Sequence, residues 1–163
     1  MGESTVITHA LLTIVAVTMA STLAGVVIFN LSDLGNSVSG LVKMGAERVK
    51  TEVLIAYISL DASNTPYTYD IYVKNVGSSR IADIGLMDVF LGSYGSALDY
   101  YQYSPQGGSG TWNYTEVGDG DDVWDPGETL IIHVYTDTIY QSPVEAVIVT
   151  PQGVRASTVQ PIP

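Results

Sequence analysis

Hydrophobic and polar positions divide the chain into two parts that follow different periods. From Val6 to Leu31 the residues are almost all apolar or small, and no Asp, Glu, Lys or Arg lies between Glu3 and Asp33. At about 1.5 Å per residue, such a run spans a hydrocarbon core of about 30 Å. It therefore predicts a membrane-length helix whose serine and threonine hydroxyls bond back to helix carbonyls. A cleaved signal peptide is the alternative, but such a peptide normally starts with a basic segment, and no lysine or arginine precedes this run.

The apolar spacing stays helical after Asp33. Apolar or small residues recur at steps of three and four, which places them on one helix face: Leu34, Val38, Leu41, Val42, Gly45, Val49 and Val53. The opposite face is polar: Asn36, Ser39, Lys43, Glu47 and Lys50. Residues 1–50 are therefore predicted to form a hydrophobic and then amphipathic helix. Its apolar face needs a cover, either the second domain or neighbouring helices.

Small residues mark one face of the first half of this helix. Ala16, Ala20 and Ala24 recur every four residues, and Ser21 and Gly25 form a second pair beside them. This spacing allows another helix backbone to approach closely in lipid. The pattern favours a helix–helix interface, while the alternative is that alanine is simply common in membrane helices.

Residues 51–163 follow the period of two that is typical of strands. Tyr69, Ile71 and Val73 alternate with Asp70 and more polar neighbours. Short β-branched and aromatic runs are separated by turn clusters, and the predicted strands are 52–60, 68–76, 81–91, 98–103, 112–117, 129–135 and 144–150. Seven or eight such strands indicate a two-sheet, immunoglobulin-like sandwich. The expected fold class is an α+β lollipop, with a long transmembrane or filament-core helix followed by an all-β head.

Composition narrows the function classes. The 163 residues carry 17 acids and 6 bases, for a formal charge of −11, and an acidic surface argues against nucleic acid as a partner. The chain has no cysteine, which excludes a disulfide framework, a zinc-thiolate site and a cysteine nucleophile. With two histidines and no nucleophile-elbow or phosphate-loop motif, we expect neither an enzyme nor a catalytic site, and no resident cofactor.

One acidic segment, Gly118–Glu128, could carry chemistry. Calcium prefers six to eight hard oxygens on a flexible loop. The candidate ligands are the carboxylates of Asp119, Asp121, Asp125 and Glu128 with the carbonyl of Val123. However, Trp124 stands where a calcium hand has glycine, and the Asp-Pro-Gly-Glu end is typical of a turn into the next strand. A solvated acidic loop and a Ca²⁺ site therefore both remain open.

The sequence gives opposing indications of the side of the membrane on which the β domain lies. Lys43, Arg48 and Lys50 follow the apolar run and favour a cytoplasmic position for that flank. The acidic, tyrosine-rich β domain favours the outside, as does the glycosylation sequon at Asn113, which we expect to be exposed on a loop. We expect the β domain to lie outside the membrane.

Several segments together resemble a known family. The run STVITHALLTIVAVTMASTLAGVV leads into a β region that contains YVKNVGSSRIADIGLMDVFL, WDPGETLIIHVY and AVIVTPQGVRAS. These segments resemble the FlaG/FlaF group of archaellum accessory proteins, which are related to archaellins and archaeal type IV pilin-like subunits. The Ser4–His9 start and the Ala24-Gly25 pair are more similar to FlaG. Archaellins and pilins are made with a basic leader, and because nothing basic precedes Gly2, a leaderless accessory protein is expected.

The resemblance implies a structural role. Such proteins anchor by the N-terminal helix, project a β-sandwich outside the membrane and form part of the stator around the archaellum motor. The implied partners are other copies in an oligomer or filament, other archaellum subunits, S-layer protein and membrane lipid. The expected function is thus an extracytoplasmic archaellum assembly subunit. The alternatives are an archaellin or pilin-like filament subunit and a membrane-anchored module that binds S-layer, glycan or calcium.

Overall fold

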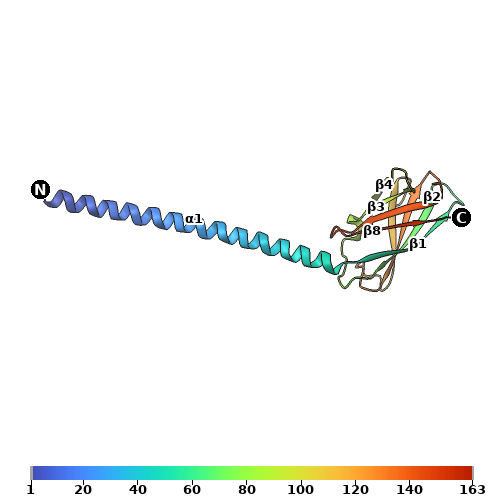
Figure 1. Ribbon diagram of the computed structural model, residues 1–163, viewed down its shortest axis with the longest axis horizontal. Coiled ribbons are helices and arrows are strands. Elements are labelled where there is room, and N and C mark those ends of the chain that lie inside the picture. The colour runs from blue at the N-terminus through green and yellow to red at the C-terminus, as the bar shows by residue number, and fades with distance from the viewer. Residues whose placement is uncertain (1, 163) are drawn as a thin grey trace. The chain divides into compact units, whose positions relative to one another are not determined.

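The computed structural model describes residues 2–162, with side chains from Val6 onward. The chain divides into two compact units, Met1–Met44 and Gly45–Pro163. Figure 1 shows one long helix, α1 (Gly2–Lys50), followed by the strands of the second unit, which we call the head. The expected fold class is confirmed: a long N-terminal helix precedes an eight-stranded β-sandwich that is nearly a closed barrel.

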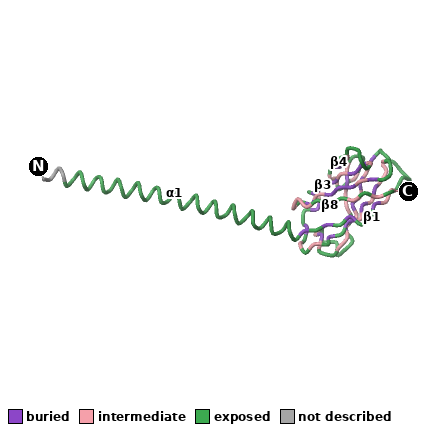
Figure 2. The backbone as a smooth tube through the Cα atoms, in the orientation of Figure 1, coloured by how far each residue is buried: buried purple, intermediate pink, exposed green. Residues whose placement is uncertain are grey.

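Helix α1 is continuous from Gly2 to Lys50, including Gly35, Gly40 and Gly45, where low helix propensity could have broken it. Every described side chain between Val6 and Lys50 is exposed, and Figure 2 shows this part of the helix in the exposed colour. The helix is long and apolar enough to cross a membrane. As the sequence predicted, hydroxyls bond back to carbonyls four residues earlier, for example from Thr13 Oγ1 to His9 O at 2.8 Å.

The last turn of α1 belongs to the head unit and is tied to it by hydrogen bonds. Ser78 N donates to Lys50 O at 2.8 Å, and Arg48 Nη2 donates to Gly153 O at 3.0 Å. The first bond satisfies a carbonyl group that a helix C-terminus otherwise leaves without a partner, and the second joins a side chain of the last turn to the head backbone. Only glycine fits at residue 77, because a Cβ atom there would lie 2.5 Å from the carbonyl oxygen of Lys50.

The head contains eight strands in the spatial order β1-β2-β6-β5-β4-β3-β7-β8. Neighbouring strands are antiparallel except β4 and β5, which are parallel over two residue pairs. The strands are β1 (Val53–Asp61), β2 (Tyr67–Asn75), β3 (Asp88–Ser93), β4 (Asp99–Tyr103), β5 (Thr111–Val117), β6 (Thr129–Thr136), β7 (Val144–Val149) and β8 (Arg155–Gln160). The short β4–β5 contact therefore joins two four-stranded sheets.

One hydrophobic core fills the space between the two sheets. It contains the inward residues of all eight strands, together with Ile81, Ile84, Met87 and Trp124 from the connections. Both tryptophans, Trp112 and Trp124, are completely buried, and Figure 2 shows the buried segments gathered in the head. Burial of a large side chain stabilises the fold by about 1.5–3 kcal/mol, so this core supplies the head with its own source of stability.

The structure differs from the predicted strands in two places. The strand expected over 81–91 is broken: Ile81 forms one bridge to Trp124, a 3-10 helix η1 covers Ile84–Leu86, and β3 begins only at Asp88. The break occurs because Asp83 is left-handed, with φ 55°, a value that no regular strand adopts. In addition, β8 was not among the seven ranges, although an eighth strand was expected, and Val53 belongs to β1 instead of continuing the helix face.

Candidate assembly surface and site residues

The small residues predicted as an interface lie on one face of an exposed helix. Because α1 is continuous, Ala16, Ala20 and Ala24 stack on successive turns, and no described side chain of the helix is buried within the chain. Ser21 Oγ donates to Val17 O at 2.8 Å, so its hydroxyl is satisfied within the helix. The space beside Gly25 is open, since apart from its chain neighbours and the helix's own nearby backbone no described atom lies within 4 Å of the Cβ position. This face is therefore free to contact another helix.

The apolar face of the second half continues the same stripe. Steps of three and four connect Ala24 with the later apolar positions: Val27, Leu31, Leu34, Val38, Val42, Gly45 and Val49. The sequence predicts each half separately, but only a helix without a break keeps them in line. We call the whole face, from Ala16 to Val49, the helix stripe. Its large side chains are 50–87% exposed, so α1 presents one long apolar surface.

The structure brings together only part of the predicted calcium set. One carboxylate oxygen from each of Glu116, Asp119 and Asp121 lies within 4.8 Å of the other two. Asp125 is instead held by Arg80, with Asp125 Oδ1 and Arg80 Nε 2.9 Å apart. Glu128 Oε2 accepts a hydrogen bond from the Asp125 backbone N–H at 2.8 Å. Sequence reasoning missed Glu116 because it belongs to the preceding strand, β5.

The acids of this loop also act as acceptors for its own backbone. Glu116 accepts hydrogen bonds from the N–H groups of Gly120 and Asp122, at 2.9 and 3.0 Å. Asp121 Oδ1 accepts one from Val123 N–H at 2.9 Å. Burial, followed by the charge of Asp122, raises the pKa of the nearby Tyr114 to about 12, so this phenol remains neutral at ordinary pH. The loop has an internal structural role, and calcium binding stays a prediction.

The glycosylation sequon lies in a strand and not in the expected loop. Asn113 and Thr115 belong to β5, two residues apart, and both point away from the core. The Oδ1 atom of Asn113 accepts a hydrogen bond from Tyr135 at 3.2 Å. The Asn113 side chain is half-buried on the outer face of this sheet.

A hydrogen-bonded histidine on the same face was not predicted. The Nδ1 atom of His133 lies 2.7 Å from Asp70 Oδ1, and its Nε2 atom lies 2.9 Å from Thr115 Oγ1. The three side chains link β2, β6 and β5. The register between the three strands brings these side chains together. The sequence does not reveal which strands pair or in what register, so it could not predict this network. The network stabilises the outer face of this sheet.

Comparisons with known proteins agree with this architecture. The family model for archaeal-type flagellin matches residues 2–160. An uncharacterized protein from Archaeoglobus fulgidus is 32% identical over 150 residues, covering 89% of this chain and 88% of that protein. The chain belongs to the archaeal-type flagellin family. It is therefore an archaellum-related structural subunit, and the resemblance drawn from the sequence is confirmed.

Solved structures give the same result for the fold. The archaellum periplasmic stator protein FlaG from Sulfolobus acidocaldarius is 26% identical, with a TM-score of 0.55 over 67% of this chain and 98% of that one. The FlaF and FlaG stator complex from the same organism is 28% identical, with a TM-score of 0.54 over 67% and 88%. The archaeal flagellum of Methanospirillum hungatei strain JF1 shares the fold, with a TM-score of 0.67 over 96% and 92% at 13% identity.

Proposed function

We propose that this protein is a FlaG-like, non-enzymatic subunit of the archaellum that assembles through α1. The helix stripe carries the proposal, because it is a long apolar face whose large side chains are exposed. An exposed apolar surface of this length calls for lipid, another helix or both. The small residues Ala16, Ala20 and Ala24 are suited to a helix partner, and the larger residues beside them are suited to lipid.

The comparisons support assembly with further subunits. One similar structure is a complex of FlaF with FlaG, and another is an archaeal flagellum. An archaellin or pilin-like filament subunit is the second candidate, in which the first half of α1 lies in a filament core and not in lipid. A membrane-anchored binding module that acts as a monomer is the candidate of another class. Self-association separates it from the other two.

Co-purification tests the assembly. We expect two full-length copies with different affinity tags, co-expressed and extracted in mild detergent, to be recovered together on either resin. The matched control is each tagged copy expressed alone and mixed after extraction, which measures exchange and non-specific binding. Recovery of only the copy that carries the matching tag would contradict self-assembly and favour the monomeric module.

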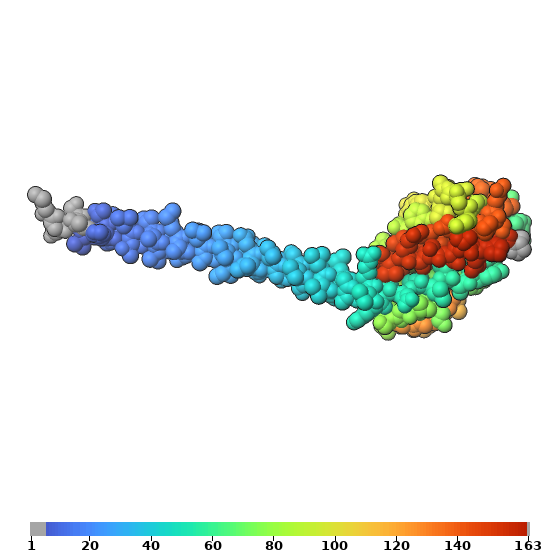
Figure 3. Space-filling model, in the orientation of Figure 1, coloured from blue at the N-terminus to red at the C-terminus, as the bar shows by residue number. Residues whose placement is uncertain are grey.

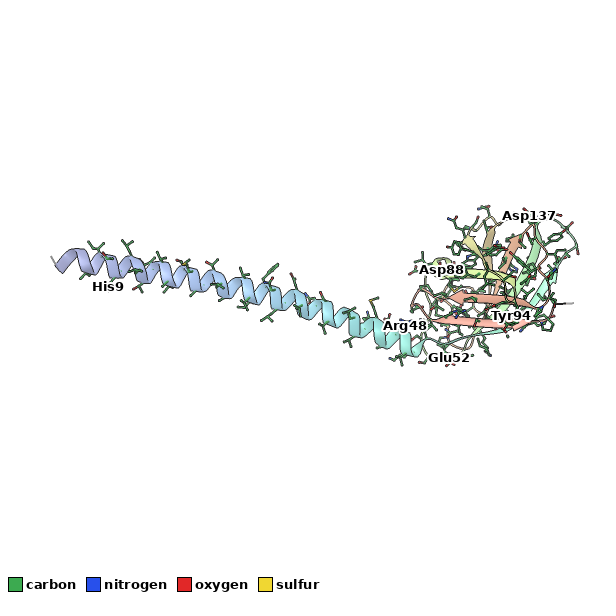
Figure 4. The ribbon with its side chains drawn as sticks, turned by 45° about the horizontal axis from the view of Figure 1, so that its top comes forward. His9, Arg48, Glu52, Asp88, Tyr94 and Asp137 are labelled. Carbon is green, nitrogen blue, oxygen red and sulfur yellow. The ribbon has the colours of Figure 1, made fainter. Side chains whose placement is uncertain are left out.

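We also propose that the head lies outside the membrane. The support is its charge, since residues 61–163 carry thirteen acids and three bases, and the sequon at Asn113. Because the chain has no cysteine, Tyr94→Cys creates a single thiol at a position that is 61% exposed and labelled on the head in Figure 4. We expect a membrane-impermeant maleimide to label this variant in intact cells as fully as in lysed cells. Labelling only after lysis would place the head inside.

Three further features are predictions that remain to be tested. They are calcium binding at the acidic loop, glycosylation of Asn113 and contact of the head with an S-layer protein. The convergence of Glu116, Asp119 and Asp121 supports the first, but these acids also have backbone partners. The outward position of Asn113 supports the second. The third rests on the family resemblance alone.

A further inference from the structure

The two edge strands of the head meet without pairing. Strands β1 and β8 stand at opposite ends of the strand order, yet they lie side by side in space. Figures 1 and 3 show this proximity, with the red β8 segment against the teal β1 segment. No backbone hydrogen bond joins them in the described residues. We call this gap the seam. Along it, the outer edge of β1 has no strand paired to it by backbone hydrogen bonds.

One side chain crosses the seam. The Oε1 atom of Gln160, on β8, accepts a hydrogen bond from the Ile58 backbone N–H at 2.9 Å. Its Nε2 atom donates to the Ala56 carbonyl at 3.2 Å. Both contacts lie where β1 carries a bulge, since its register with β2 shifts between Ile55 and Tyr57. The primary amide therefore makes the donor and acceptor bonds that a peptide group of an added strand would make.

We propose that Gln160 closes the seam and blocks the edge of β1 against strand pairing with a second copy of the chain. Unpaired strand edges readily pair with other chains, and natural sheets protect them. The need for protection rests on the proposed function, because an assembly formed by α1 holds heads close together. Leu54 and Tyr57 are 55% and 54% exposed on β1, so an opened edge would also offer apolar contacts. Gln160 thereby keeps the edge of β1 out of self-association.

Hydrogen exchange of the full-length chain tests the closure. Gln160→Met keeps the length of the side chain and removes both hydrogen bonds. We expect the Ile58 amide to exchange about tenfold faster or more, the effect of losing its one partner, while the Ile71 amide in the interior strand β2 is unchanged. Val159→Met is the matched control, because Val159 neighbours Gln160 and makes no bond to β1. An unchanged exchange rate at Ile58 in Gln160→Met would overturn the proposal.

A second variant serves as the test if Gln160→Met does not fold. Gln160→Glu keeps an acceptor for the Ile58 N–H and loses the donor to the Ala56 carbonyl. Because a carboxylate oxygen would then face the Ala56 carbonyl and be repelled by it, we expect the Ile58 amide to keep part of its protection but to exchange faster than in the native chain. If Gln160→Met does not fold, an Ile58 exchange rate in Gln160→Glu equal to that of the native chain would overturn the proposal.

Association of chains whose helix interface is disrupted tests whether Gln160 blocks the edge of β1. In a chain that carries Ala20→Leu and Ala24→Leu, we expect adding Gln160→Met to restore association through the heads by at least about tenfold, while adding Val159→Met does not. A triple variant that stays as monomeric as its parent would contradict the blocking role. If the parent itself still assembles fully, the proposed function fails instead, and the exchange result at Ile58 judges the closure independently.

Discussion

Replacing Ala20 and Ala24 with leucine is expected to weaken assembly of the full-length chain while the head stays folded. Both residues lie on the helix stripe, one turn apart, and each substitution adds three carbon atoms to a face that must approach another backbone closely. Leucine keeps the helix propensity high, so α1 itself is preserved. We expect the association constant to fall on the order of tenfold or more. Sedimentation equilibrium in detergent measures this change.

The opposite face of the same helix provides the control. Thr18 and Thr22 have the same spacing of four and are offset by two residues, which turns them away from Ala20. In the described part of the chain, their hydroxyls donate to the helix carbonyls of Ile14, Val15 and Thr18. Leucine at both threonines is therefore expected to leave association unchanged. Equal losses in the two double variants would show that the effect is one of bulk and not of a specific interface.

Replacing Asn75 with alanine is expected to destabilise the head by about 3 kcal/mol or more. Asn75 is fully buried, and its side chain makes three hydrogen bonds to backbone groups. Nδ2 donates to the carbonyls of Ser79 at 2.9 Å and Trp124 at 3.0 Å, and Oδ1 accepts from Gly77 N–H at 3.1 Å. Removing the amide takes away three hydrogen bonds, each worth about 1 kcal/mol, and leaves the Ser79 carbonyl without this partner. The Trp124 carbonyl and the Gly77 N–H keep their backbone bonds to the Ile81 N–H and the Glu52 carbonyl. Urea unfolding followed by tryptophan fluorescence measures the loss.

Two comparisons make the Asn75 result specific. Asn64→Ala changes the same residue type at an exposed loop position and should alter the free energy of unfolding by less than about 0.5 kcal/mol. Asn75→Asp keeps the acceptor for Gly77 N–H but turns a carboxylate oxygen toward two carbonyl oxygens. It should therefore be no more stable than Asn75→Ala. A loss below about 1 kcal/mol in Asn75→Ala would refute the central role of this side chain.

The sequence predicts elements whose signal is periodic and local. A charge-free run predicts α1, and alternation predicts strands such as β2 and β6, because each side chain's environment follows from its neighbours along the chain. It does not predict β8, where RASTVQ is mostly polar and lacks strong alternation. It also misses the break before β3, which depends on the left-handed backbone of Asp83.

The predicted site residues also divide into those with a local sequence signal and those that depend on contacts between distant segments. The spacing of Ala16, Ala20 and Ala24 is a local pattern, so their common face follows directly from the helix. The convergence of Glu116 with Asp119 and Asp121, the contacts of His133 and the closure by Gln160 depend on strand register between distant segments. Single-sequence periodicity contains no information about register between unpaired runs. These features are therefore visible only in the structure.

Electron microscopy of the full-length chain, beside the same chain without residues 1–33, tests the central claim most directly. The account predicts filaments or particles that contain several heads from the full-length chain. It predicts single heads from the shortened chain, since removing these residues deletes the small-residue half of the helix stripe. Single heads on detergent micelles from the full-length chain, at concentrations where both preparations are folded, would contradict assembly through α1. The protein would then be an anchored module, and the next question would be what its head binds.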